Sequence, residues 1–355
     1  MEQAASSCTT LAPDAPEVSL PLLNRLAKKI LPVWVRHGIR DSIHFSDGLG
    51  WFYRDYVRYF QHSGVLHPEE EVRLRARITA CYHVLEKGLS HHDPHLGFGK
   101  DKASELARFL KTYSNAGYPT SCSQYQSAIA VLNSYREFQQ HNNLEVPALV
   151  TRLLHELSPT PVGCNGGCST ERGEDLCASW RGDFRSLAMH RHSIRHFTGA
   201  PVSEAAIQRA VDLARFAPSA CNRQFVRVHV LKTRRQIEQV LELQRGARGF
   251  SDLVDKLLIV TADLRGYVSF SERHLPYVDG GLFAMALTYA LCYEGIGSCP
   301  LNMALSLETE AEIRGIASLS EPEAAIVLLG IGNIPDSLRV AHSQRKPLHE
   351  YLVFH

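Results

Sequence analysis

The sequence has no excess of charge of either sign, no dense set of cysteines and no long hydrophobic run. Its 38 Lys and Arg residues nearly balance its 37 Asp and Glu residues, for a formal net charge of +1. This balance argues against nucleic acid as the main partner, because a phosphate backbone is bound by a strongly basic surface. The longest apolar stretches, such as 324–331, are too short to cross a bilayer. We therefore expect neither a nucleic-acid partner nor a membrane span.

The nine cysteines are odd in number and scattered over 355 residues. They lack the density of a disulfide-stapled secreted domain, so we expect mostly reduced thiols. Met1–Glu17 has no positively charged start followed by an apolar run and does not resemble a secretory signal. Together these features predict a cytoplasmic protein. The composition, 45% hydrophobic and 21% charged, is that of an ordinary globular protein, and the length allows two domains.

Composition and periodicity divide the chain into four parts. Residues 1–18, rich in Ala, Ser, Thr and Pro, are typical of a flexible tail. Helical patterns predict an all-helical N-terminal domain over 19–157. Residues 158–180 contain several Gly and Pro and three Cys, and are predicted to be a linker or domain boundary. The final part, 181–355, mixes helices and strands. In the helical domain, the predicted helices cover 68–86 (stopped by Gly88), 101–117, 121–140 and 146–157.

The final part has a second kind of pattern. Helices are predicted over 202–216 and 280–294, and strands over 226–231, 257–262 and 324–329. This order fits an α+β sandwich in which helices surround a mostly antiparallel sheet.

Four short segments of 181–355 carry polar groups suited to a phosphorylated ligand. The first, 191–197 (RHSIRHF), combines two arginines, a hydroxyl and backbone amides that we expect near a helix start, as a phosphate monoester requires. The second, 218–224 (PSACNRQ), offers a hydroxyl, two amide side chains and a proline-shaped turn for the edge of a planar heterocycle. The others are 295–302 (GIGSCPLN) and 343–348 (SQRKPL). Each alone is commoner as a cap or turn, so their joint occurrence is what indicates a function.

In this order and spacing, the four segments resemble those of the FMN-dependent nitroreductase family, over about 181–355. The resemblance implies a nitroreductase-like sandwich fold, FMN as the cofactor and NADH or NADPH as a transient hydride donor. It also implies a homodimer whose flavin sites lie at the subunit interface. The helical N-terminal domain is then an extension with no assigned role.

The resemblance also implies roles for single residues. Phosphate-binding positions are matched by Arg191, Ser193 and Arg345, and His192, between the first two, is an expected cofactor-binding residue. Arg195 matches the basic residue that reaches the ribityl chain or the pyrimidine edge. The ring-lining positions are matched by Pro218, Ser219, Ala220, Asn222 and Gln224. The segment beside the hydride-accepting ring nitrogen is matched by Pro300, Leu301 and Asn302. Of these residues, Arg195 and Asn302 are the expected catalytic positions.

The chain departs from the family pattern at two places. Family members commonly continue Gln-Pro-Trp after the asparagine, whereas this chain has Gln224-Phe225-Val226, so one wall of the pocket is expected to differ. Ser343 stands where many members have a lysine, two residues before Arg345, which removes one charge from the phosphate clamp.

Several other patterns leave alternatives open. Cys164, Cys168 and Cys177 could bind a metal but lack the paired Cys-x-x-Cys form, and we predict no metal site. His83, Glu86 and the 91–95 segment (HHDPH) could hold a divalent ion, form a capped helix end, or cover the flavin pocket and select the substrate. Cys221 and Cys299 are either packing residues or thiols that touch the flavin or substrate. The Gly330–Pro335 segment begins like a dinucleotide fingerprint but lacks its third glycine and following helix.

Three functional hypotheses follow. The first is an FMN-dependent oxidoreductase that transfers hydride from NAD(P)H through the flavin to a small organic acceptor (nitro, quinone or enone-like) by a ping-pong mechanism. The second is a dedicated biosynthetic tailoring flavoenzyme acting on one intermediate, with the helical half as a substrate domain. The third is a flavin-binding interaction protein whose redox activity is incidental.

Overall fold

The computed structural model describes residues 32–62, 69–157, 166–267 and 270–355. The predicted tail over 1–18 and residues 158–165 of the predicted linker lie outside these residues. By internal contacts the chain divides into two units, Met1–Gln61 and His62–His355. The described part of the first unit is almost entirely a helix, α2 (Val33–His62), which lies within the region predicted to be helical but was not predicted as a separate element.

The second unit begins with four helices, as the sequence predicts. They are α3 (Glu71–Leu89), α4 (Lys100–Asn115), α5 (Ser123–His141) and α6 (Ala148–Glu156). Apolar residues three or four apart on α3, such as Leu74, Ile78 and Leu85, are fully buried in a shared core. Aromatic residues of α4 and α5 fill the same core. The core contains the aromatic residues Tyr113, Tyr125 and Tyr135 and the aliphatic residue Leu132.

One boundary in this part differs from the prediction. Gly88 was expected to end α3, but the helix continues through it to Leu89. A Cβ atom at Gly88 would overlap the ring of Phe98. The glycine therefore permits close packing inside the helix instead of terminating it.

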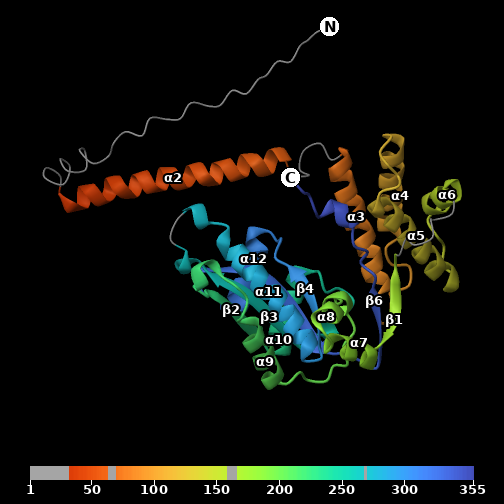
Figure 1. Ribbon diagram of the computed structural model, residues 1–355. Coiled ribbons are helices and arrows are strands. Elements are labelled where there is room, and N and C mark those ends of the chain that lie inside the picture. Colours follow the sequence, from red (N-terminus) through yellow and green to blue (C-terminus); the bar gives the residue numbers. More distant parts are fainter. Residues whose placement is uncertain (1–31, 63–68, 158–165, 268–269) are drawn as a thin grey trace, which may run out of the picture. The chain divides into compact units, whose positions relative to one another are not determined.

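The centre of the second unit is a four-stranded antiparallel sheet. Its strand order is β2 (Val226–Leu231), β3 (Lys256–Asp263), β5 (Glu323–Asn333) and β4 (Ile296–Asn302). Every residue of β3 is buried, because helices cover both faces of the sheet (Figure 1). The predicted α+β class with a mostly antiparallel sheet is confirmed.

Alternate residues of β3 enter two different cores. Leu258 and Val260 pack with α9 (Glu204–Ala214) and α11 (Leu275–Tyr293). Leu257 and Ile259 pack with α10 (Arg234–Gln244) and α12 (Leu307–Ile316). This is the alternation expected of a strand covered on both sides.

A second, two-stranded sheet joins distant parts of the sequence. β1 (Cys168–Arg172) pairs antiparallel with β6 (Ser337–Ala341), and Cys168 lies opposite Ala341. β1 is followed by α7 (Gly173–Trp180) and α8 (Phe184–His190). Residues 166–180, at the end of the predicted linker, thus form a strand and a helix. The pair lies beside α3 and α7 (Figure 1).

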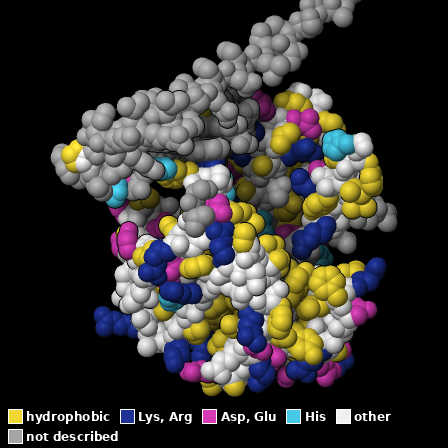
Figure 2. All heavy atoms as spheres, turned by 60° about the vertical axis from the view of Figure 1, so that its left-hand side comes forward, with side chains coloured by type: hydrophobic (Ala, Val, Ile, Leu, Met, Phe, Trp, Pro, Cys, Tyr) yellow, Lys and Arg dark blue, Asp and Glu magenta, His cyan; other side chains and the backbone are white. Residues whose placement is uncertain are grey.

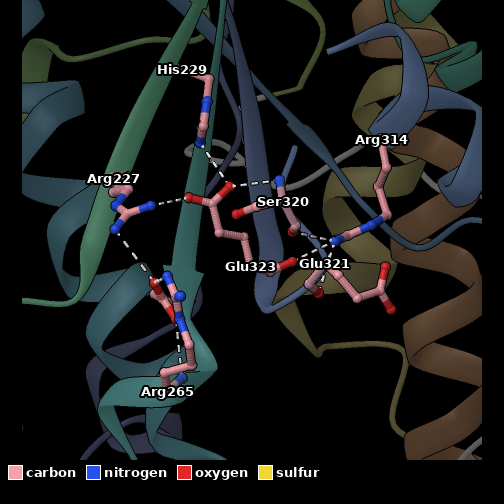
Figure 3. Close-up of polar contacts among 8 residues, drawn as sticks. Arg227, His229, Arg265, Arg314, Ser320, Glu321 and Glu323 are labelled. Carbon is pink, nitrogen blue, oxygen red and sulfur yellow. Dashed lines mark hydrogen bonds and ion pairs between the residues drawn. The ribbon is translucent and has the colours of Figure 1, made fainter. Parts of the chain in front are cut away.

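A charged cluster ties together one end of β2, β3 and β5 (Figure 3). Asp263 and Glu323 lie opposite each other in the register of β3 and β5, and both side chains are 1% exposed. Arg227 bridges them, at 3.4 Å from Asp263 and 2.9 Å from Glu323. Arg265 binds Asp263 at 2.6 Å, and His229 lies 3.1 Å from Glu323. The two buried carboxylates are therefore paired with cations, as burial of charge requires.

Within the part of the chain that the structure describes, one helical segment is long and apolar enough to cross a membrane. The most apolar 18-residue window within residues 270–293, which include α11, has a mean hydropathy of 1.3, and 44% of this window is buried. The expectation that no apolar stretch reaches this length is therefore wrong on length and composition alone. Core helices of water-soluble proteins pass the same test, and α11 contacts β3, β4, β5 and α9. The segment is weak evidence of a membrane span.

Candidate functional site

Residues 191–197 form an extended segment held in place by its own apolar residues. Ile194 and Phe197 are buried in the core. The Ile194 amide donates to the Ser298 carbonyl of β4 at 2.9 Å. The expectation of a nearby helix start is wrong: the segment follows the C-terminal end of α8, and α9 begins only at Glu204. Positive charge here comes from guanidinium groups, since the amides of a helix N-terminus are not available.

This segment lines a cavity of about 560 Å³ together with two other stretches of chain. The second stretch is 342–345, directly after β6, and the third is one face of α3. The two predicted phosphate-binding segments, 150 residues apart in the sequence, thus meet at one cavity. Its lining comprises Thr79, Tyr82, His83, Glu86, Met189, Arg191, His192, Ser193, His342, Ser343, Gln344 and Arg345.

Strand β6 brings the C-terminal segment to this place. Its pairing with β1 ends at Ala341, and the next amide, of His342, donates to the Gly167 carbonyl at 3.2 Å. Ser343 takes a left-handed conformation with φ 48°, which turns the chain. The Arg345 guanidinium donates to the Ser343 carbonyl at 2.6 Å. The turn after β6 therefore fixes the position of Arg345 at the cavity.

Arg195 lies beside the cavity and is almost completely buried, at 6% exposure. Its Nη1 donates to the Ser193 carbonyl at 3.3 Å, and its Nε has no hydrogen-bond partner. Burial lowers the pKa of Lys87 on α3, and the positive charge of Arg195 lowers it further. Burial raises the pKa of Cys299 on β4, and the charge of Arg195 opposes this effect but is smaller. A buried cation with an unsatisfied donor is costly to the fold, so it indicates a place prepared for a polar or anionic ligand.

The contribution of α3 was only partly foreseen. Thr79, Tyr82, His83 and Glu86 recur at intervals of three and four residues, so they share one helical face. The sequence singled out His83 and Glu86, as metal ligands or as part of a cover, but not Thr79 or Tyr82. The spacing of four polar residues on a helix whose other face is apolar was the available signal.

Glu86 is the least expected group in the cavity wall. Its side chain is 1% exposed, and its Oε2 atom has no hydrogen-bond partner. Burial raises its pKa to about 7, although the backbone amides of Gly167 and Ser343 and the charges of Arg195 and Arg345 act in the opposite direction. With a pKa of about 7, this carboxyl group is partly protonated near neutral pH.

The predicted ring-lining segment, 218–224, lies at a different cavity. This smaller one, of about 120 Å³, is lined by Pro218, Ser219 and Gln224 with Arg215, Ala217, Val226, Asp279 and Phe283. The loop is strained, because Cys221, Asn222 and Gln224 have positive φ angles of 52°, 55° and 58°. Asp279 of α11 holds it by accepting from the Ala220 amide at 3.1 Å. Within one chain, this segment does not line the cavity of Arg191.

The third predicted segment, 300–302, ends strand β4. Leu301 is buried, whereas Pro300 and Asn302 are exposed. The side-chain oxygen of Asn302 accepts a hydrogen bond from the Ala304 amide at 3.0 Å. The backbone carbonyl of Asn302 accepts one from the side-chain amide of Gln244, also at 3.0 Å. These residues also do not line the Arg191 cavity. Cys299, just before them, is buried, and burial raises the pKa of its thiol, so it packs as a small apolar residue.

Other candidate sites take structural roles. Among the described residues, no three His, Cys, Asp or Glu side chains come together in a way that could hold a metal ion; Cys164 lies outside them. The His92 ring stacks on His196 at 3.9 Å, which joins the loop after α3 to the 191–197 segment. Gly330–Asn333 belongs to strand β5, and a Cβ at Gly332 would overlap Phe197, so these glycines serve packing.

The larger cavity fits a phosphate monoester. Arg191 and Arg345 supply guanidinium groups and Ser193 a hydroxyl, a donor set typical of phosphate sites. The volume exceeds that of a phosphate and leaves room for a linked polar chain. The unpartnered Nε of Arg195 lies next to these donors in the sequence and in the fold.

Comparison with known proteins gives one family match. The family model described as the nitroreductase family matches residues 188–254, a range that includes the 191–197 and 218–224 segments. No curated protein matches the sequence.

Several solved structures are distantly similar. A candidate NAD(P)H:FMN oxidoreductase from Staphylococcus epidermidis is 19% identical over 49% of this chain and 96% of its own, with a TM-score of 0.43. A candidate nitroreductase in complex with FMN from Desulfovibrio desulfuricans is 18% identical over 48% and 95%, with a TM-score of 0.41. An FMN-dependent nitroreductase from Clostridium difficile is 16% identical over 40% and 83%, with a TM-score of 0.36. Because these likenesses are distant, we base the assignment on the family match and on the residues of this chain.

Proposed function

We propose that the protein is an FMN-dependent NAD(P)H oxidoreductase, because the nitroreductase family model matches residues 188–254. The observation that supports this proposal best is the cavity at which Arg191, Ser193 and Arg345 meet. These residues come from segments 150 positions apart, yet all were expected from the sequence to bind one phosphate. If the two arginine-containing segments were unrelated in function, we would not expect them to lie at the same cavity.

The chain's own residues then have distinct tasks. Arg191, Ser193 and Arg345 hold the phosphate of the cofactor, with His192 beside them in the cavity wall. Arg195, buried and fixed to the Ser193 carbonyl, supplies a positive charge that stabilises electron density gained by the cofactor on reduction. When bound, FMN supplies reversible hydride acceptance, so the protein needs few acids or bases of its own.

We assign the remaining expected contacts to a second copy of the chain. Residues 218–224 and 300–302 do not line the Arg191 cavity, so we propose a homodimer in which one subunit brings its ring-lining segment to the partner's cavity. Exposed apolar side chains support this view, because a free monomer would leave them in water. Figure 2 shows hydrophobic side chains gathered between Lys and Arg on one face of the molecule. Those exposed on α11 are Tyr277, Val278, Leu282, Met285 and Tyr293.

The reaction we propose is ping-pong. NADH or NADPH binds transiently, delivers a hydride and leaves, and a small organic acceptor (nitro, quinone or enone-like) takes its place. The protein would act in the cytoplasm. The assignment of Asn302 and Arg195 as catalytic positions belongs to this proposal, since both lie on segments that flank the cofactor in the expected dimer.

The proposal is tested with the purified full-length chain. We expect it to carry a yellow chromophore that is bleached by anaerobic titration with NADH or NADPH and restored by an acceptor. An Arg345→Ala variant should lose the chromophore on dialysis, whereas Arg152→Ala, at an exposed position on α6, should keep it. Colourless protein that neither binds added FMN nor oxidises either nucleotide would refute the assignment.

A further inference from the structure

The helical N-terminal half contributes one ionisable group to the phosphate cavity for which the family resemblance offers no role. Glu86 of α3 lines the same cavity as Arg191, Ser193 and Arg345. Its side chain is 1% exposed, and its Oε2 atom has no hydrogen-bond partner among the described residues. A buried polar atom without a partner, at the wall of a cavity, is available to a ligand.

We propose that Glu86 belongs to the phosphate site, and that one proton lies between its carboxyl group and the phosphate when the cofactor binds. This inference rests on the proposed function, since it concerns the phosphate of the same flavin. The proton comes from solvent and binds to the Glu86 carboxylate as the phosphate enters the cavity, and no other bond forms or breaks. Glu86 is then a specificity residue contributed by the helical half.

The physical reason is repulsion between like charges. An ionised carboxylate and a phosphate dianion in one cavity repel each other strongly, because a buried site screens charge less than water does. Protonation removes this repulsion and converts Oε1 or Oε2 into a hydrogen-bond donor. In the ligand-free protein the pKa of Glu86 is already about 7 because of burial. The phosphate raises it further, so binding above neutral pH takes up a proton.

Other charged groups around Glu86 respond differently to pH. Burial lowers the pKa of His83 and of His192, so both are neutral above pH 7. Burial also lowers the pKa of Lys87, whose loss of charge at high pH would weaken phosphate binding independently of Glu86. Burial raises the pKa of the Cys168 thiol and of the Tyr82 phenol, so both remain protonated. Among the described residues, the titratable and charged groups around Glu86 are His83, Lys87, Tyr82, Cys168, Arg191, His192, Arg195, His342 and Arg345.

The test measures flavin affinity against pH in the full-length apoprotein. FMN and riboflavin, which lacks the phosphate, are titrated between pH 7.5 and 8.5 by quenching of flavin fluorescence. Calorimetry in two buffers of different ionisation enthalpy counts protons. The wild type is compared with Glu86→Gln, which keeps the size of the side chain and removes its titration. The control is Glu137→Gln, an exposed glutamate of α5 in the same helical part.

For the wild type, we expect the Kd of FMN to rise about eightfold from pH 7.5 to 8.5, with uptake of nearly one proton at pH 8.5. Riboflavin should show neither effect. Glu86→Gln should bind FMN with a nearly constant Kd and no proton uptake, and Glu137→Gln should match the wild type. If the dependence persists in Glu86→Gln, it belongs to Lys87, and our inference about Glu86 is wrong.

The experiment distinguishes failure of the inference about Glu86 from failure of the proposed function. A wild type that binds FMN with a constant Kd and takes up no proton overturns the role of Glu86 but leaves the proposed flavin enzyme intact. A wild type that binds neither FMN nor riboflavin overturns both.

Discussion

The buried carboxyl of Glu86 makes the stability of the apoprotein depend on pH, and replacing it with Gln should remove that dependence. Its pKa is about 7 in the folded chain, against 4.5 for an unperturbed Glu. A carboxyl whose pKa is raised on folding favours the folded state fully below pH 4.5, and this contribution is lost as the pH rises through 7. Between pH 5 and pH 8 the loss amounts to about 2.5 kcal/mol, because one pKa unit corresponds to roughly 1.36 kcal/mol.

The assay is urea denaturation of flavin-free wild type and Glu86→Gln at pH 5 and pH 8. Glutamine retains an oxygen that can accept from the Gly167 and Ser343 amides, so the helix packing is preserved. We expect the free energy of unfolding of the wild type to fall by about 2.5 kcal/mol more than that of the variant between the two pH values. Equal changes in the two proteins would show that Glu86 is not desolvated, and the reasoning would be wrong.

Four further predictions concern single residues. Arg195→Ala should weaken FMN binding roughly tenfold or more and slow flavin reduction, because a hydrogen bond to a charged group is worth about 1.5–3 kcal/mol; fluorescence titration and stopped-flow absorbance test this, and unchanged values would exclude a cofactor role. Asp279→Asn should speed hydrogen exchange of the Ala220 amide, whose acceptor is Asp279; an unchanged rate would show that the strained loop is held otherwise. Asp263→Asn should be less stable than the wild type at pH 6, with the difference shrinking below about pH 4, because its hydrogen bond to Arg265 lowers the pKa of Asp263 to about 2; a difference independent of pH would contradict this. Gly88→Ala should cost about 1–3 kcal/mol by overlap with Phe98, whereas Gly315→Ala, with open space around it, should not.

The sequence predicted the classes of most elements because their periodicities are strong. Strand β2 was placed at its observed residues, and α5 and α11 were located to within a few positions. Strands β1, β4 and β6 were missed, and β1 lies in the predicted linker. β4 contains Gly297 and Pro300, which weaken a strand pattern, and β6 is only five residues long and is stabilised by pairing with β1 across 160 residues of sequence.

The sequence predicted which residues belong to the candidate site, but not how all of them are arranged in space. The motifs identified Arg191, Ser193 and Arg345 as partners, and the structure brings them to one cavity. The role of α3 in that cavity could not be deduced, because nothing in a single sequence tells which face of a helix meets which loop. The separate position of 218–224 was equally hidden, since tertiary contacts such as that of Asp279 with Ala220 decide it.

The pairing of β1 with β6 has a consequence for how the protein is made. Thr79, in the first quarter of the chain, and Arg345, ten residues from its end, line the same cavity. During translation the helical half emerges before β6, so its cavity face stays without a counterpart until β6 and the segment after it have emerged. Closing a loop of this length costs conformational entropy that only the completed contacts recover. The cavity is therefore completed only once the residues after β6 have been synthesised, and a chain that stopped before Arg345 would lack one of its two guanidinium groups.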